Sequence, residues 1–196
     1  MNASLLALLA LTTAIPSGLE SRRLDPYGGL TSVRFTSTGF FRTHHDGQRW
    51  WLVTPDGHAF LSIGVCCVRS RACADRTTGR IPYQENILAR YGSADAWIDV
   101  TRTRLAEWGF NTLGGWSSDE VKNVARTICL SFARSMCREG TYPDFFHPDV
   151  TARAAEVAAG VKHLRNDPYV IGYFLDNELE GGGQLATLDA CFQKVH

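Results

Sequence analysis

Short apolar runs alternate with amphipathic segments along most of the chain. The runs are rich in Phe, Leu, Ile, Val and Tyr, and they are short and nearly continuous, which is typical of strands buried on both faces of a parallel sheet. Ahead of them, aromatic segments at 40–42 and 50–53 lie on either side of Asp46-Gly47 and predict a β-hairpin. The buried strands are predicted over residues 59–65, 110–113, 127–130 and 169–175.

Helices are predicted between these strands. In the segment 94–108, Trp97, Thr101, Leu105 and Trp108 recur at helical spacing, and Gly109 follows as a stop signal. Ser117-Ser118-Asp119-Glu120 has the hydroxyl cap and acidic first turn of a helix that would lead to Arg126. The clearest helix follows Pro148-Asp149, and a last one is predicted over residues 184–195. The helix after Pro148 has one apolar stripe made of Val150, Ala154, Val157, Val161 and Leu164.

The strand–helix alternation predicts an α/β fold with parallel strands and right-handed crossovers. A doubly wound sheet and a (β/α)₈ barrel of the TIM type both fit this order. No Gly-x-Gly-x-x-Gly or Gly-Lys-Ser/Thr motif follows a predicted strand, which argues against the nucleotide-binding versions of the doubly wound sheet. The three glycines at 181–183 are interpreted as a loop.

The N-terminal residues differ from the rest. Leu5–Ile15 is apolar but shorter than the ~20 residues that span a bilayer, so we expect a signal peptide over residues 1–17 rather than a membrane insertion. No Lys or Arg precedes the run, which leaves open an N-terminal extension without its own fold. The first interpretation predicts an extracellular or periplasmic protein, and the second a cytoplasmic one. Residues 18–38 are polar and are expected to form an irregular linker, with the main domain over residues 39–196.

The charge balance and aromatic content of the chain limit the classes of binding partner that we expect. Lys plus Arg equals Asp plus Glu at 20 each, so the chain lacks the basic surface that nucleic acids or anionic membranes require. Aromatic residues are 11% of the chain and include five Trp, which favours carbohydrate, although any one Trp more often fills a core. A polysaccharide or oligosaccharide is therefore the expected partner.

No cofactor or metal is expected. The six cysteines include no Cys-x-x-Cys pair, and most are interpreted as small buried residues of the core; a Cys129–Cys137 disulfide is the alternative. His44-His45-Asp46 lies in the predicted hairpin turn and is interpreted as a solvated loop. Four arginines after the first strand are interpreted in the same way: Arg69, Arg71, Arg76 and Arg80.

The end of the last predicted strand carries the strongest candidate chemistry. Catalytic residues of (β/α) barrels lie at the carboxyl ends of strands, and Asp176-Asn177-Glu178 directly follows such a strand. Partial shielding from water favours a protonated carboxylic acid, which is what a glycosidic oxygen needs as proton donor. The neighbouring Asn177 can bind a sugar hydroxyl. The alternative is that the three polar residues only terminate the strand.

The wider sequence resembles a known family. Residues 166–178 closely resemble the fourth strand of β-agarase-like retaining glycoside hydrolases. Residues 60–65 and 108–116 resemble that family's first two strands, and residues 144–149 resemble the approach to its third helix. The resemblance spans roughly residues 39–183.

The resemblance implies a (β/α)₈ barrel that hydrolyses β-linked polysaccharide of the agarose or galactan type. Glu178 would be the acid/base, and Asn177 and Asp176 would bind substrate beside it. Trp116, at the end of the second strand, would stack on a sugar ring, with a packing role as the alternative. Glu180 is a rival to Glu178 outside the matched motif.

Two departures limit this expectation. Cys66 stands where the family usually has a polar residue. A retaining mechanism also needs a second carboxylate about 5 Å from the first, and that nucleophile comes from the seventh strand of these barrels. Four strand–helix units are predicted here, whereas a full barrel takes ~250 residues. We therefore expect the front half of a barrel with an incomplete site.

Two further hypotheses remain open. One is a catalytically inactive remnant that at most binds carbohydrate, and the other is an unrelated α/β hydrolase or isomerase. An open half barrel also predicts self-association through its unpaired first and fourth strands.

Overall fold

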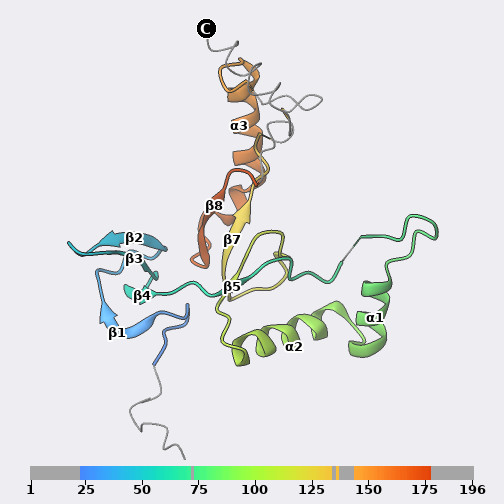
Figure 1. Ribbon diagram of the computed structural model, residues 1–196, viewed down its shortest axis with the longest axis horizontal. Coiled ribbons are helices and arrows are strands. Elements are labelled where there is room, and N and C mark those ends of the chain that lie inside the picture. Colours follow the sequence, from blue (N-terminus) through green and yellow to red (C-terminus); the bar gives the residue numbers. More distant parts are fainter. Residues whose placement is uncertain (1–22, 72, 134–135, 137–143, 178–196) are drawn as a thin grey trace, which may run out of the picture.

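The computed structural model describes residues 23–71, 73–133, 136 and 144–177, and it contains two four-stranded sheets (Figure 1). The first sheet is antiparallel, with the order β1-β4-β3-β2, and the second is parallel, with the order β5-β6-β7-β8. The antiparallel strands are β1 (Leu30–Arg34), β2 (Arg42–His45), β3 (Trp50–Val53) and β4 (His58–Phe60). The parallel strands are β5 (Gly64–Val65), β6 (Thr112–Leu113), β7 (Ala125–Cys129) and β8 (Val170–Phe174). The α/β class and the parallel pairing are thus confirmed, and within the described residues the parallel sheet stays open.

The antiparallel sheet contains the predicted hairpin and one unexpected strand. β2 and β3 pair from His45↔Trp50 outward, and the Asp46 carboxylate accepts hydrogen bonds from the backbone N–H of Gln48 and Arg49 in the turn. β1 lies inside the segment expected to be irregular, so that expectation is wrong for Leu30–Arg34. Its polar sequence carries little strand signal of its own, because pairing with β4 is what orders it.

The predicted strand over residues 59–65 is wrong as a single element. Its first part ends β4 in the antiparallel sheet, and Gly64 begins β5 in the parallel sheet. Between them the chain crosses from one sheet to the other, and Leu61 is 69% exposed. An apolar run predicts strands, but it does not show that its two ends pair in different sheets.

Three α-helices are described. α2 (Ala94–Glu107) confirms the predicted helix, with Ser93 as its cap: the Ser93 hydroxyl accepts a hydrogen bond of 3.1 Å from the Ala96 N–H. α3 (Asp149–Gly160) is confirmed and continues into a 3₁₀ helix, η2 (Lys162–Leu164). α1 (Pro82–Tyr91) lies in a region for which no helix was predicted.

The helix predicted from Ser117 to Arg126 is wrong. This segment consists of turns and bends and enters β7 at Ala125. The Ser118 hydroxyl does accept the Glu120 N–H, as a cap would, but Asn123 has a φ of 60°, which ends helical geometry. The helix predicted over residues 184–195 lies outside the described residues.

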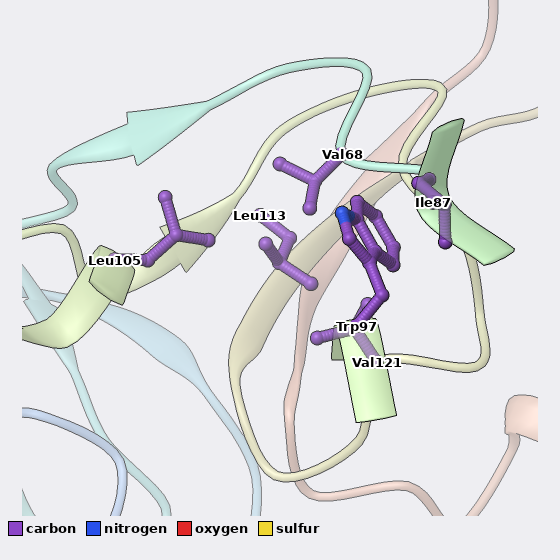
Figure 2. Packing of buried hydrophobic residues seen from close by; sticks show 6 residues of the cluster. All are labelled: Val68, Ile87, Trp97, Leu105, Leu113 and Val121. Atoms are coloured by element: carbon purple, nitrogen blue, oxygen red, sulfur yellow. The ribbon is translucent and has the colours of Figure 1, made fainter. Parts of the chain in front are cut away.

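Two apolar clusters hold the fold together. One lies between α1, α2 and the parallel sheet, where Figure 2 shows the Trp97 indole among the surrounding aliphatic side chains. The other joins the two sheets and contains Phe41, Phe60 and Ala125, with Leu52 and Ile171 packed against it. The first cluster consists of Val68, Ile87, Trp97, Leu105, Leu113 and Val121.

Within the part of the chain that the structure describes, no helix is long and apolar enough to cross a membrane.

Candidate active site

The carboxyl ends of the four parallel strands lie along one edge of their sheet. Hydrogen bonds continue between neighbouring segments beyond the strands, from Gly114 N to Val65 O at 2.8 Å and from Cys67 N to Gly115 O at 3.0 Å. This edge is where catalytic residues of (β/α) barrels gather. We call it the carboxyl rim and define it as residues 66–67, 114–116, 130–133 and 175–177.

The carboxyl rim concentrates unusual backbone geometry. Non-glycine residues with positive φ are Cys67, Trp116, Asn123 and Ser131 among those described, and three of these four lie in the carboxyl rim. A left-handed conformation costs a non-glycine residue about 1 kcal/mol or more, and such residues cluster at functional sites. The strand ends at this edge are therefore held in defined, unfavourable turns.

Two glycines in the carboxyl rim leave room for thiols. A Cβ on Gly114 would lie 2.5 Å from Cys66 Sγ, and a Cβ on Gly115 would lie 2.6 Å from Cys129 Sγ. Burial, reinforced by the nearby Cys66, raises the pKa of the Cys129 thiol, so this group stays protonated at neutral pH. Larger residues than glycine would displace both sulfur atoms.

The cysteines are less buried than expected. Cys66, Cys67 and Cys73 are exposed, which contradicts the expectation of core cysteines, and Cys129 is half-buried. The physical reason is their position: Cys66 and Cys67 follow the end of β5, and Cys73 lies in the loop before α1. Cys137 lies outside the described residues, and so does any bridge it would make.

Three of the five site residues predicted from the sequence are described, and all three lie in the carboxyl rim. Trp116 is 45% exposed at the end of β6, and Asn177 is exposed after β8. Asp176 is half-buried, and both of its carboxylate oxygens lie 2.9 Å from the Ala133 N–H. Glu178 and its rival Glu180 lie outside the described residues. The fold thus places Trp116, Asp176 and Asn177 at the same edge of the parallel sheet.

Sequence reasoning missed the residues that support this edge. Arg153 in α3 donates hydrogen bonds of 3.3 Å to the carbonyls of Phe132 and Ser131. No motif could have revealed this role, because the partners are backbone atoms 21 and 22 residues away. The left-handed Ser131 likewise has no signature in the sequence.

The described residues also line two cavities. A cavity of about 450 Å³ lies at the amino ends of the parallel strands, among mostly apolar residues that include Tyr27, Leu105 and Phe110. A smaller one, of about 320 Å³, separates Cys129 and Leu130 from α3. Among the described residues, no group of three or more His, Cys, Asp or Glu side chains is placed to hold a metal ion.

The fold is that of solved agarase structures, of which the chain covers a part. An agarase named AgWH50C has a TM-score of 0.65 at 23% identity, over 88% of this chain and 37% of that one. An exo-β-agarase has a TM-score of 0.63 at 20% identity, over 81% of this chain and 34% of that one. The structure of BpGH50 has a TM-score of 0.64 at 19% identity, over 83% of this chain and 39% of that one.

Sequence relatives agree with the fold. β-Agarase A of Vibrio sp. (strain JT0107) is 33% identical over 192 residues, which include 70% of this chain and 19% of the relative. β-Agarase B of the same strain is 25% identical over 226 residues, and the match covers 80% of this chain and 24% of the relative. No family model matches the chain. The chain therefore spans about a fifth to a quarter of the curated relatives it matches, and over that part it resembles β-agarase-like glycoside hydrolases in sequence and in fold.

Proposed function

We propose that this chain provides the first four strands of a (β/α)₈ barrel that hydrolyses β-linked polysaccharide of the agarose or galactan type. The observation that carries the proposal is the carboxyl rim of β5–β8, because Trp116 and Asn177 lie there in a fold shared with agarases. Under this proposal, residues 39–196 belong to the catalytic domain, and residues 1–17 act as a signal peptide that exports the protein.

In the proposed mechanism Glu178 is the acid/base. It would first give its proton to the glycosidic oxygen as the sugar–oxygen bond breaks, while a second carboxylate attacks the anomeric carbon. Glu178 would then take a proton from the water that hydrolyses the glycosyl–enzyme intermediate. Asn177 would bind the sugar's 2-hydroxyl, and the half-exposed Trp116 indole would stack on a ring.

The second carboxylate belongs to a later strand in this proposal. Retaining enzymes hold the two carboxyl groups about 5 Å apart, and barrels of this kind take the nucleophile from the seventh strand. The parallel sheet described here corresponds to the first four, β5–β8. The active enzyme would therefore need further strand–helix units.

The test compares Glu178→Gln with Glu180→Gln. The chain, joined to the later strand–helix units that the proposal requires, is incubated with agarose and with a chromogenic β-galactoside, and reducing ends and released chromophore are measured. We expect Glu178→Gln to reduce turnover by at least about 100-fold, since positioned acid–base catalysis contributes 10²–10⁴, and Glu180→Gln to leave it within about twofold.

Other outcomes separate the alternatives. Loss of turnover in Glu180→Gln alone would move the acid/base to the rival residue. Binding of agaro-oligosaccharides by isothermal titration calorimetry, without turnover even when the later strand–helix units are joined to the chain, would support an inactive carbohydrate-binding remnant. Absence of both turnover and binding would overturn the proposal.

A further inference from the structure

We infer that Asp176 is a positioning residue, whose carboxylate holds the loop Ser131–Ala133 against the end of β8. The sequence alone favoured direct sugar binding by Asp176. The structural part of this inference stands by itself. Its importance for hydrolysis rests on the proposed function, because the loop affects hydrolysis only if the substrate binds at the carboxyl rim.

The hydrogen bonds between β7 and β8 continue past both strands. Leu130 N donates to Phe174 O at 2.9 Å, and Phe132 N donates to Leu175 O at 2.8 Å. The next acceptor is a side chain, because Ala133 N lies 2.9 Å from each carboxylate oxygen of Asp176. Asp176 thus extends the pairing of β7 and β8 by one residue after the strand geometry has ended.

Burial makes the contact between Asp176 and Ala133 energetically important. Ala133 is fully buried, so its N–H cannot form a hydrogen bond with solvent water. A buried backbone donor left without an acceptor costs about 1–3 kcal/mol, and a bond to an ionised acceptor is stronger than one between neutral groups. The carboxylate of Asp176 is therefore a charged acceptor that helps to keep Ala133 in place.

The other side of the loop is held by α3. The Arg153 guanidinium donates to the carbonyls of Ser131 and Phe132, and its Nη1 lies 2.9 Å from the Glu156 carboxylate. Ser131 has a φ of 51°, a conformation that persists only where the surroundings impose it. The N–H groups of Phe132 and Ala133 are thus bound to the end of β8, and the carbonyls of Ser131 and Phe132 are bound to α3.

This arrangement assigns different tasks to two neighbouring residues. Asp176 directs both oxygens at the loop, whereas Asn177 is exposed and follows it directly. The loop, through Asp176, fixes the backbone from which Asn177 projects. Asp176 would therefore affect sugar binding through geometry, and Asn177 through contact.

Hydrogen exchange tests the inference without depending on catalysis. Asp176→Asn keeps an oxygen of the same reach, whereas Asp176→Ala removes the acceptor and Asp176→Glu keeps the charge but displaces it by one methylene. We expect amide exchange in the peptide containing residues 130–133 to rise about tenfold in Asp176→Ala, the loss of one hydrogen bond. We expect smaller rises in Asp176→Glu, which displaces the carboxylate, and in Asp176→Asn, which leaves one neutral oxygen where two charged oxygens face the Ala133 N–H.

Asp144→Ala is the matched control, because Asp144 also accepts a backbone N–H, that of Phe146 at 2.9 Å. It should leave exchange at residues 130–133 unchanged. Affinity for agaro-oligosaccharides, measured by calorimetry, should follow the exchange rates, with the weakest binding in Asp176→Ala.

The inference is overturned if Asp176→Asn and Asp176→Glu leave exchange unchanged while Asp176→Asn weakens sugar binding, since that result means direct contact through charge. If Asp176→Ala does not fold, the comparison of Asp176→Asn with Asp176→Glu decides the same point. If no form of the chain binds sugar, the proposed function fails, and the exchange rates still decide whether Asp176 positions the loop.

Discussion

At the scale of single residues, Asp25 joins the approach to β1 with the turn between β3 and β4. Its carboxylate accepts hydrogen bonds from the Thr54 hydroxyl at 2.6 Å and from the backbone N–H of Tyr27 and Gly29, and it lies 2.8 Å from His58 Nδ1. The side chain is only 2% exposed. The polar interior of the antiparallel sheet therefore depends on one carboxylate.

Replacing Asp25 should destabilise the protein in a pH-dependent way. Burial alone would raise the pKa of Asp25, but the hydrogen bonds from Thr54, Gly29, His58 and Tyr27 outweigh it and hold the pKa below its ordinary value. Because the folded pKa is lower than the unfolded one, the stabilisation is present above the unfolded pKa of about 3.9 and is lost as pH falls through the folded pKa. We expect Asp25→Asn to lower the free energy of unfolding by about 1–3 kcal/mol at pH 7, and by less at pH 3, in urea titrations.

The control for this prediction is Asp99→Asn, because Asp99 is an exposed carboxylate paired with Arg102 on α2. Exposed pairs of this kind contribute about 0–1 kcal/mol. A loss for Asp25→Asn that is the same at pH 7 and pH 3 would contradict the role assigned to the ionised carboxylate.

At the scale of secondary-structure elements, the spacing of apolar residues in α2 determines which side chains pack against the parallel sheet. Trp97, Thr101 and Leu105 are spaced by four residues and are the buried residues of this helix. Trp97 and Leu105 belong to the cluster that also contains Leu113 of β6, which fixes the helix against the parallel sheet (Figure 2). Trp108, at the C-cap, continues the sequence pattern but is 65% exposed.

Two tryptophans of the same stripe should therefore behave differently. We expect Trp97→Ala to lower the free energy of unfolding by about 3–5 kcal/mol, since it empties a buried site. Trp108→Ala should cost less than about 1 kcal/mol, because its described partner is an Arg104 guanidinium 5.8 Å from the ring. Thermal and urea unfolding of the two variants measure this difference, and equal losses would contradict the packing described here.

At the scale of the whole molecule, the open parallel sheet exposes large apolar side chains. Tyr173, Phe174 and Leu175 are all exposed at the end of β8, and no described strand pairs with the outer edge of β8. None of the residues of α3 is buried. Apolar surface next to an unpaired strand edge favours association between chains.

We expect the isolated chain to self-associate through this edge. Light scattering coupled to size-exclusion chromatography should show a mass that rises with protein concentration, and Phe174→Ser combined with Leu175→Ser should reduce it. Trp50→Ser is the control, since Trp50 is equally solvent-exposed but lies on the β2–β3 hairpin. A monomer at all concentrations would contradict this expectation.

Much of the local structure follows from the sequence. The hairpin around Asp46-Gly47, the helix that begins after Ser93 and the strand β8 each agree with a pattern of neighbouring residues, although the burial predicted for β8 is wrong, since Tyr173 and Phe174 are exposed. These elements are predictable because turn, cap and periodicity signals act over a few residues. The position of Asp176 and Asn177 at a strand end follows from the same pattern.

Only the tertiary structure decided which segments are partners. β1 acquires its strand geometry by pairing with β4, one apolar run is divided between two sheets, and the segment after Ser117 forms no helix although it begins with a cap. The contact between Asp176 and Ala133 joins residues 43 positions apart. Hydrophobic periodicity predicts which residues share a face, but what packs on that face depends on distant residues, and at the carboxyl rim the tertiary structure places the Asp176 carboxylate against the Ala133 N–H.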